Sequence, residues 1–164
     1  AQACRQRGVE VDVELVGDGP ESGALKALAG DLGIAEHVTF RGYIPFSEVR
    51  AAMSRSTILV HPSDGLGDGL PNVLREAMAV GTPVIASRVA GIPEALDDGR
   101  CGMLVPPKDV NALAHAIEAL LADQEMRGRF ATLGRRRTED LFDLTRNGVR
   151  LAERLRSTTR RAAP

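Results

Sequence analysis

The stretch HPSDGLGDGLPNVLREAMAVGTPVIAS, residues 61–87, decides the fold of this chain. Residues 57–61 are almost continuously apolar, as in a parallel strand that is covered on both faces. A glycine-rich loop follows, and Pro71 then suits the first position of a helix that ends at Gly81. Residues 83–86 read as the next strand. The stretch therefore predicts two parallel strands joined by a helix in a right-handed crossover.

The same alternation extends in both directions from this unit. Further strands are expected at residues 11–16, 38–40 and 102–105, and helices after the turn at 17–20, after Ser47 and after Asp109. The tail from residue 124 onward is expected to be helical and rich in arginine. We predict one α/β domain over residues 1–164, with a doubly wound, Rossmann-like parallel sheet. Its core spans about 9–122 and its C-terminal helices about 124–157.

Composition narrows the classes of partner. The 22 acidic and 21 basic residues give a net charge of −1, which excludes a field over the whole domain that would hold nucleic acid. Cys4 and Cys101 are far apart, and neither a secretory signal nor an apolar run of membrane-spanning length is present. We therefore expect a cytoplasmic protein with reduced thiols. The spacing of the histidines and cysteines predicts no metal site.

The glycine-rich loop at 62–70 is the candidate binding site. Ligands of open α/β sheets bind beyond the carboxyl ends of the strands, which is where this loop and the following helix start are expected. The loop glycines let the backbone approach an anion, and free N–H groups around Leu70, Asn72 and Val73 carry the positive end of the helix dipole. The pattern favours a diphosphate site. The alternative is a tight connection with no ligand.

Glu76 is the candidate ribose ligand. Helical spacing places Glu76 at the margin of the inward face, where its carboxylate can accept hydrogen bonds from two vicinal hydroxyls. The alternative is a surface glutamate paired with an arginine.

Several segments together resemble one family. They are 16–20, 61–63, 68–79, 81–87, 91–94 and 102–109, and they cover most of the chain up to about Leu121. They are similar to the donor-site pattern of the family 4, or group 1, retaining glycosyltransferases, which have the two-domain GT-B architecture. The resemblance implies the C-terminal, nucleotide-sugar-binding half of such an enzyme, lacking its first strand and its N-terminal domain.

The resemblance also implies roles for individual residues. The family pattern has two glutamates with seven residues between them. The second falls on Glu76 and implies a grip on the donor ribose. The first falls on Asp68, which implies a catalytic position beside the transferred sugar but is one methylene shorter than the family's glutamate. Backbone groups of four residues would contact the sugar and the diphosphate without a metal or other cofactor: Gly69, Leu70, Pro71 and Asn72.

The implied reaction is transfer of a sugar from a nucleotide diphosphate to an acceptor with retention, in bacterial synthesis of surface polysaccharide or glycolipid. The acceptor, a sugar or a lipid-linked sugar, would bind the absent N-terminal domain. That domain and a basic pair that would precede Ala1 are both lacking, so the chain alone is expected to be inactive. The arginine-rich tail leaves two interpretations open, namely peripheral contact with acidic lipid at the inner face of the membrane and a solvated helix with i,i+4 ion pairs.

Two other functions remain as alternatives. The chain is a non-catalytic nucleotide-sugar-binding or interaction module if Asp68 marks lost chemistry. It is an NAD(P)-binding domain if Gly17 and Gly19 belong to a dinucleotide fingerprint and Arg41 binds a 2′-phosphate, although Ser22 stands where the last glycine is required. Tyr43 follows a strand and either flanks the nucleotide base or packs in the core.

Overall fold

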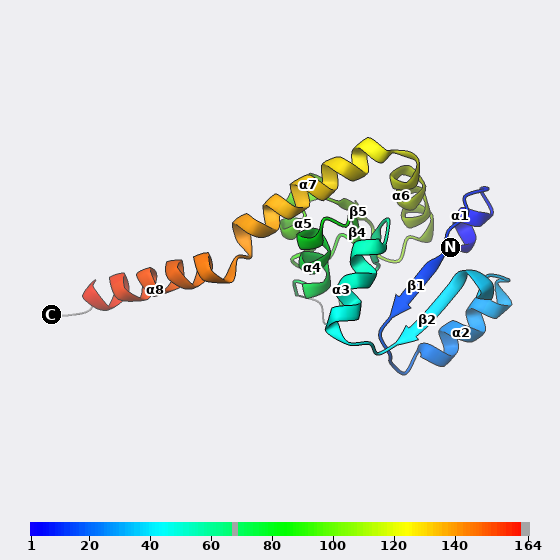
Figure 1. Ribbon diagram of the computed structural model, residues 1–164, viewed down its shortest axis with the longest axis horizontal. Helices are drawn as coiled ribbons and strands as arrows, with labels where there is room; N and C mark the ends of the chain where they lie inside the picture. Colours follow the sequence, from blue (N-terminus) through cyan, green and yellow to red (C-terminus); the bar gives the residue numbers. More distant parts are fainter. Residues whose placement is uncertain (67–68, 162–164) are drawn as a thin grey trace.

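The computed structural model describes residues 1–66 and 69–161, in which strands and helices alternate along the chain (Figure 1). The strands are β1 (Val13–Val16), β2 (Val38–Gly42), β3 (Leu59–His61), β4 (Val84–Ser87) and β5 (Met103–Val105). The helices are α1 (Gln2–Arg5), α2 (Ser22–Asp31), α3 (Phe46–Arg55), α4 (Asn72–Val80), α5 (Ile92–Ala95), α6 (Val110–Ala122), α7 (Gln124–Leu141) and α8 (Leu144–Arg161). Short 3-10 turns lie at Ala35–His37 and Asp97–Gly99.

The strands form parallel sheets, as predicted. β1 pairs with β2, and β4 lies between β3 and β5. The α/β class is therefore confirmed, but the described strands are hydrogen-bonded as two sheets and not as one. No hydrogen bond joins β1 to β3. Hydrogen-bonded neighbouring strands lie about 4.8 Å apart, so the described strands form two separate sheets. β1 and β3 each have one edge that no described strand covers.

β4 holds the core together. All four of its residues are buried, and their side chains alternate between the two faces of the sheet. Val84 and Ala86 pack toward α4 and α5 in one cluster, which also contains Met53, Leu74, Ala77, Met78, Ile92, Leu96 and Cys101. Ile85 packs toward α6 and α7 in a second cluster, with Val105, Ala116, Leu120 and Phe130. Helices therefore cover this sheet on both faces.

The ends of α4 are set by two special residues. The helix begins at Asn72, one position later than predicted, because Pro71 has an extended backbone and serves as the N-cap. Gly81 ends the helix with a left-handed backbone at φ 82°, as expected of a C-terminal glycine. Likewise, Asp109 caps α6 as predicted and accepts a hydrogen bond of 2.9 Å from the N–H of Ala112.

The two C-terminal helices behave differently from each other. α7 packs along α4, and a Cβ on Gly134 would lie only 3.2 Å from Cγ of Met78. α8 runs away from the body of the molecule, as Figure 1 shows at the red end of the chain. Its Leu151 and Leu155 are 59% and 62% exposed. α7 thus belongs to the packed domain, whereas α8 leaves its apolar side chains in solvent.

Candidate functional site

The carboxyl ends of β3, β4 and β5 lie at one edge of their sheet, because the strands are parallel and adjacent. The segments that leave this edge are residues 62–71, 88–91 and 106–109. Such an edge is where open α/β sheets bind ligands. The described parts of the glycine-rich loop, residues 62–66 and 69–70, therefore lie where the sequence predicted them.

The start of α4 offers free backbone donors at this edge. Among the described residues no side chain caps the helix. The first N–H groups of any α-helix lack an intrahelical partner and carry the positive end of its dipole. Gly69, just before the helix, is held by its carbonyl, which accepts a hydrogen bond of 3.0 Å from the N–H of Gly91. A Cβ on Gly91 would lie 3.2 Å from that carbonyl oxygen, so a glycine suits this close approach. The geometry suits a diphosphate.

Glu76 lies on the second turn of α4 and is partly buried. Within the described part of the chain, no arginine pairs with its carboxylate. The structure thus does not show the predicted alternative of a surface glutamate neutralised by an arginine. The carboxylate oxygens remain available as acceptors for hydroxyl groups.

The side chain of Arg75, the residue before Glu76, contacts the start of α4 and an aromatic ring beyond α7. It donates a hydrogen bond to the side-chain oxygen of Asn72, and its guanidinium lies over the ring of Phe142, 5.1 Å from the centroid. Phe142 lies between α7 and α8. Arg75 therefore links the start of α4 to the segment from which α8 departs, a contact that sequence spacing could not reveal because 67 positions separate the partners.

Comparison with known proteins decides the family. Residues 1–123 match the family described as Glycosyl transferases group 1. The chain belongs to the group 1 glycosyl transferases. It is 37% identical over 156 residues to the GDP-mannose-dependent alpha-(1-6)-phosphatidylinositol monomannoside mannosyltransferase of Mycolicibacterium smegmatis, an alignment that covers 92% of this chain and 41% of that protein.

Two solved glycosyl transferase structures resemble the chain. The sucrose-phosphate synthase of Thermosynechococcus elongatus is 32% identical with a TM-score of 0.83, over 96% of this chain and 41% of that one. HepE of Anabaena, in complex with UDP-glucose, is 27% identical with a TM-score of 0.79, over 90% of this chain and 41% of that one. The predicted GT-B resemblance is confirmed. The chain spans only 41% of the length of each of these proteins.

The predicted catalytic residue of this glycosyl transferase domain, Asp68, lies outside the described residues, and its role stays a prediction. The predicted contacts at Gly69, Leu70, Pro71 and Asn72 lie together at the helix start, and Glu76 follows on the same helix. The site is therefore assembled from one loop and one helix.

The structure does not support Arg41 as the ligand of a 2′-phosphate, the role that the NAD(P)-binding alternative required. The guanidinium of Arg41 lies 3.2 Å from Glu14 and 3.3 Å from Glu48, so two carboxylates already occupy it. Tyr43, directly after β2, is 89% exposed, so of the two alternatives for this residue, packing in the core is ruled out. Its ring is free to contact a ligand.

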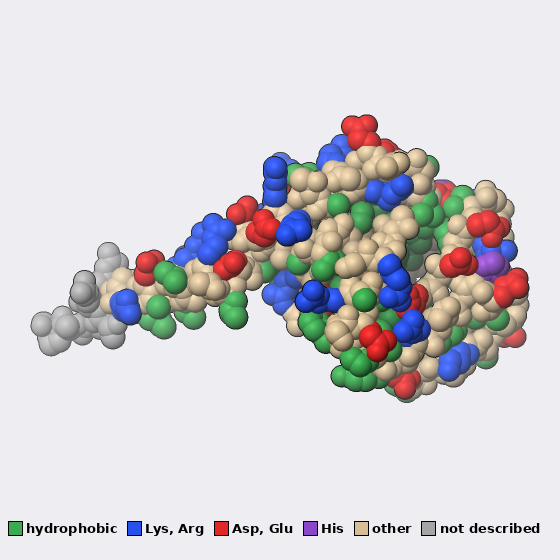
Figure 2. Space-filling view, in the orientation of Figure 1, with side chains coloured by type: hydrophobic (Ala, Val, Ile, Leu, Met, Phe, Trp, Pro, Cys, Tyr) green, Lys and Arg blue, Asp and Glu red, His purple; other side chains and the backbone are tan. Residues whose placement is uncertain are grey.

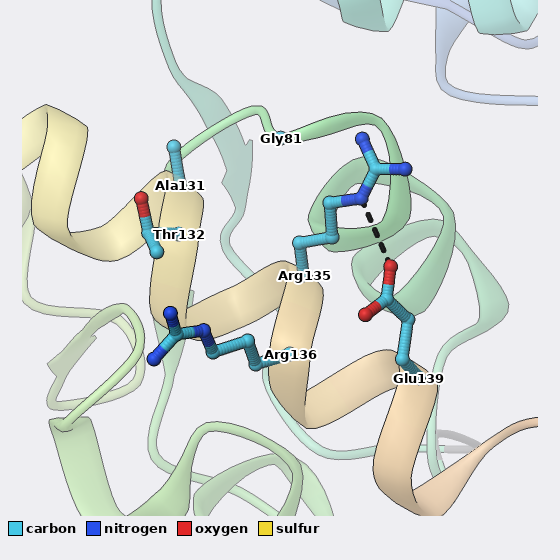
Figure 3. A pocket seen from close by; sticks show the side chains of 6 residues that line it. All are labelled: Gly81, Ala131, Thr132, Arg135, Arg136 and Glu139. Atoms are coloured by element: carbon cyan, nitrogen blue, oxygen red, sulfur yellow. Dashed lines mark hydrogen bonds and ion pairs between the residues drawn. The ribbon is translucent and has the colours of Figure 1, made fainter.

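A separate hollow of about 380 Å³ lies at the other end of α4 (Figure 3). It is lined by Gly81, Ala131, Thr132, Arg135, Arg136 and Glu139. Nε of Arg135 lies 3.0 Å from Glu139, and Gly81 is the C-terminal cap of α4. Carbonyl groups rather than N–H groups point out of this helix end, so it offers a phosphate no backbone donors like those at the start of α4.

Over residues 1–66 and 69–161, no three or more His, Cys, Asp or Glu side chains gather as metal ligands. No helix of that part of the chain is long and apolar enough to cross a membrane. Burial raises the pKa of the Cys101 thiol, which contacts the carbonyl oxygen of Ala95 at 3.8 Å. Cys101 is therefore a structural residue and a poor nucleophile.

Proposed function

We propose that the chain binds a nucleotide-diphosphate sugar at the edge where α4 begins. The free N–H groups at the start of α4 are the observation that carries the proposal, because they supply donors for a diphosphate without a metal. Glu76, on the same helix and without an arginine partner in the described chain, would accept hydrogen bonds from the ribose hydroxyls. HepE, which shares the fold at 27% identity, is in complex with UDP-glucose.

Within a complete enzyme, the bound sugar would pass to an acceptor with retention of its anomeric configuration. As the bond to the sugar breaks, negative charge grows on the departing diphosphate, and the fixed N–H groups stabilise it. The acceptor is proposed to be a sugar or a lipid-linked sugar of a polysaccharide or glycolipid. The name of the mannosyltransferase of M. smegmatis supports the lipid-linked class.

The test is calorimetric titration of the chain with UDP-glucose and with GDP-mannose. Glu76→Ala removes a charged acceptor and should weaken binding about 10- to 100-fold. Glu139→Ala, on α7 beside the opposite end of α4, is the matched control and should bind as the parent does. Equal affinity for the parent and the Glu76→Ala protein would contradict the ribose role.

The shorter acid at position 68 favours a second candidate, a module that binds the nucleotide sugar without transferring it. Restoring the family residue by Asp68→Glu in a complete enzyme distinguishes the two. Sugar transfer by either form, followed as release of free nucleotide in the presence of acceptor, supports the enzyme. Donor binding without transfer by both forms supports the module.

A further inference from the structure

Lys108 has an unusual backbone conformation at the edge that carries the proposed donor site. It lies between β5 and α6 with φ at 62°, in the left-handed region, where the Cβ of a lysine crowds the backbone. A glycine would take this conformation without strain. The lysine therefore carries a conformational cost, and it makes one contact that a glycine cannot make.

That contact is an ion pair with the glycine-rich loop. Nζ of Lys108 lies 3.7 Å from Oδ2 of Asp64. The other oxygen of the same carboxylate accepts a hydrogen bond of 3.0 Å from the N–H of Leu66. Next to it, the hydroxyl of Ser63 accepts a hydrogen bond of 3.0 Å from the N–H of Gly65. Asp64 thus joins Lys108 to the turn formed by residues 63–66.

Two further contacts hold the loop from the segment that follows β4. Gly65 passes so close to Val89 that a Cβ on the glycine would lie 3.3 Å from Cβ of the valine. The carbonyl of Gly69 accepts the hydrogen bond from Gly91 described above. Among these contacts of the described loop residues, the ion pair of Lys108 with Asp64 is the one made by charged side chains.

We propose that Lys108 is a positioning residue for the donor loop. By holding Asp64 it fixes the turn at 63–66, in which Gly65 lies against Val89 of the segment after β4. The inference rests on the proposed function for its meaning, since the loop matters only as a donor site. The effect of Lys108 on this turn can be measured without any donor.

The expected effect is modest. The side chains of Lys108 and Asp64 are 75% and 40% exposed, so water screens their attraction. Exposed ion pairs contribute little to stability. Loss of this pair should therefore change the fraction of molecules in which the turn at 63–66 is open by about two- to fivefold. An effect of this size is within reach of amide hydrogen exchange.

The experiment measures exchange of the Gly65 and Leu66 amides by NMR in the parent chain and in four variants. Lys108→Gly removes the ammonium and relieves the backbone. Asp64→Asn keeps an oxygen acceptor for Leu66 but removes the charge. The double variant and Lys108→Arg complete the set, and Arg135→Gln, which breaks an exposed ion pair on α7, is the control.

Lys108→Gly and Asp64→Asn should each raise exchange about two- to fivefold at both amides, and the double variant should match the single ones, because one interaction is lost in all three. Lys108→Arg should restore the parent rates. The melting temperature of Lys108→Gly should be no lower than that of the parent, since strain is relieved, whereas a residue that only stabilises the fold would lower it. Unchanged exchange at Gly65 and Leu66 in Lys108→Gly, or additive effects in the double variant, would overturn the proposal. Donor binding plays no part in this measurement, so a failure of the proposed function is detected separately by titration.

Discussion

α4 and α8 are both amphipathic helices, but only α4 buries its apolar face. Leu74 and Ala77 of α4 are fully buried, and Met78 is 1% exposed. In α8, Leu144, Leu151 and Leu155 are 87%, 59% and 62% exposed, and Figure 2 shows apolar side chains along one side of that helix. An amphipathic pattern thus predicts which face of a helix can pack against a partner, but only the tertiary structure shows whether that face is buried.

The polar faces of the two helices differ as well. α4 presents Glu76 and a free N-terminus to the candidate site, whereas the sequence of α8 carries six arginines and one acidic residue, Glu153. On α7, Arg135 with Glu139 is an i,i+4 ion pair of the kind that one interpretation of the tail predicted, and Arg146 of α8 pairs with Asp140 of α7. Such pairs solubilise a helix and contribute little to its stability.

The largest expected difference between the two helices concerns a buried leucine. Leu74→Ala should lower the free energy of unfolding by about 2–5 kcal/mol, because it leaves a cavity against β4. Leu151→Ala in α8 should change it by less than about 0.5 kcal/mol. Urea unfolding followed by circular dichroism measures both. Equal losses for the two variants would show that α8 also packs against the domain in solution.

Glycines give a second, smaller contrast. A Cβ on Gly102 would lie 2.7 Å from Cγ2 and 3.0 Å from the carbonyl oxygen of Val84, so Gly102→Ala should destabilise the sheet by about 1–3 kcal/mol. Gly148→Ala in α8 meets nothing within 4 Å and should raise helix stability by about 0.5–1 kcal/mol. Thermal unfolding of both variants tests this, and a stabilised Gly102→Ala protein would contradict the close packing of β4 against β5.

The smallest effect concerns the junction of the two regions. Phe142→Leu removes the aromatic face under Arg75 and should cost about 0.5–1 kcal/mol. It should also loosen α8 relative to α4, seen as lower order parameters for the residues of α8 in NMR relaxation. Arg129→Gln, which removes a similar contact with Phe130 within α7, is the control and should leave α8 unchanged. Unaltered order in α8 after Phe142→Leu would show that the ring does not tether the helix.

Local patterns were sufficient for the order of elements. The strand predicted at 83–86 was found one residue later, as β4, and the helix after Asp109 was found at the predicted place, because hydrophobic periodicity and capping depend on neighbours in the sequence. The start of α4 was displaced by one residue, since a proline suits both the N-cap and the first helical position. The split of the strands into two sheets was not predicted, because register between distant strands leaves no local pattern.

The sequence by itself therefore determined the α/β class, the family and the loop and helix that form the candidate donor site, since these depend on short spacings within residues 61–87. Only the tertiary structure decided that Arg41 is already neutralised, that Arg75 lies over Phe142 and that Lys108 reaches Asp64. These contacts join residues that are far apart in the chain or belong to different elements. Charge and side-chain reach make such contacts possible, but the packing of helices against the sheet selects which of them form.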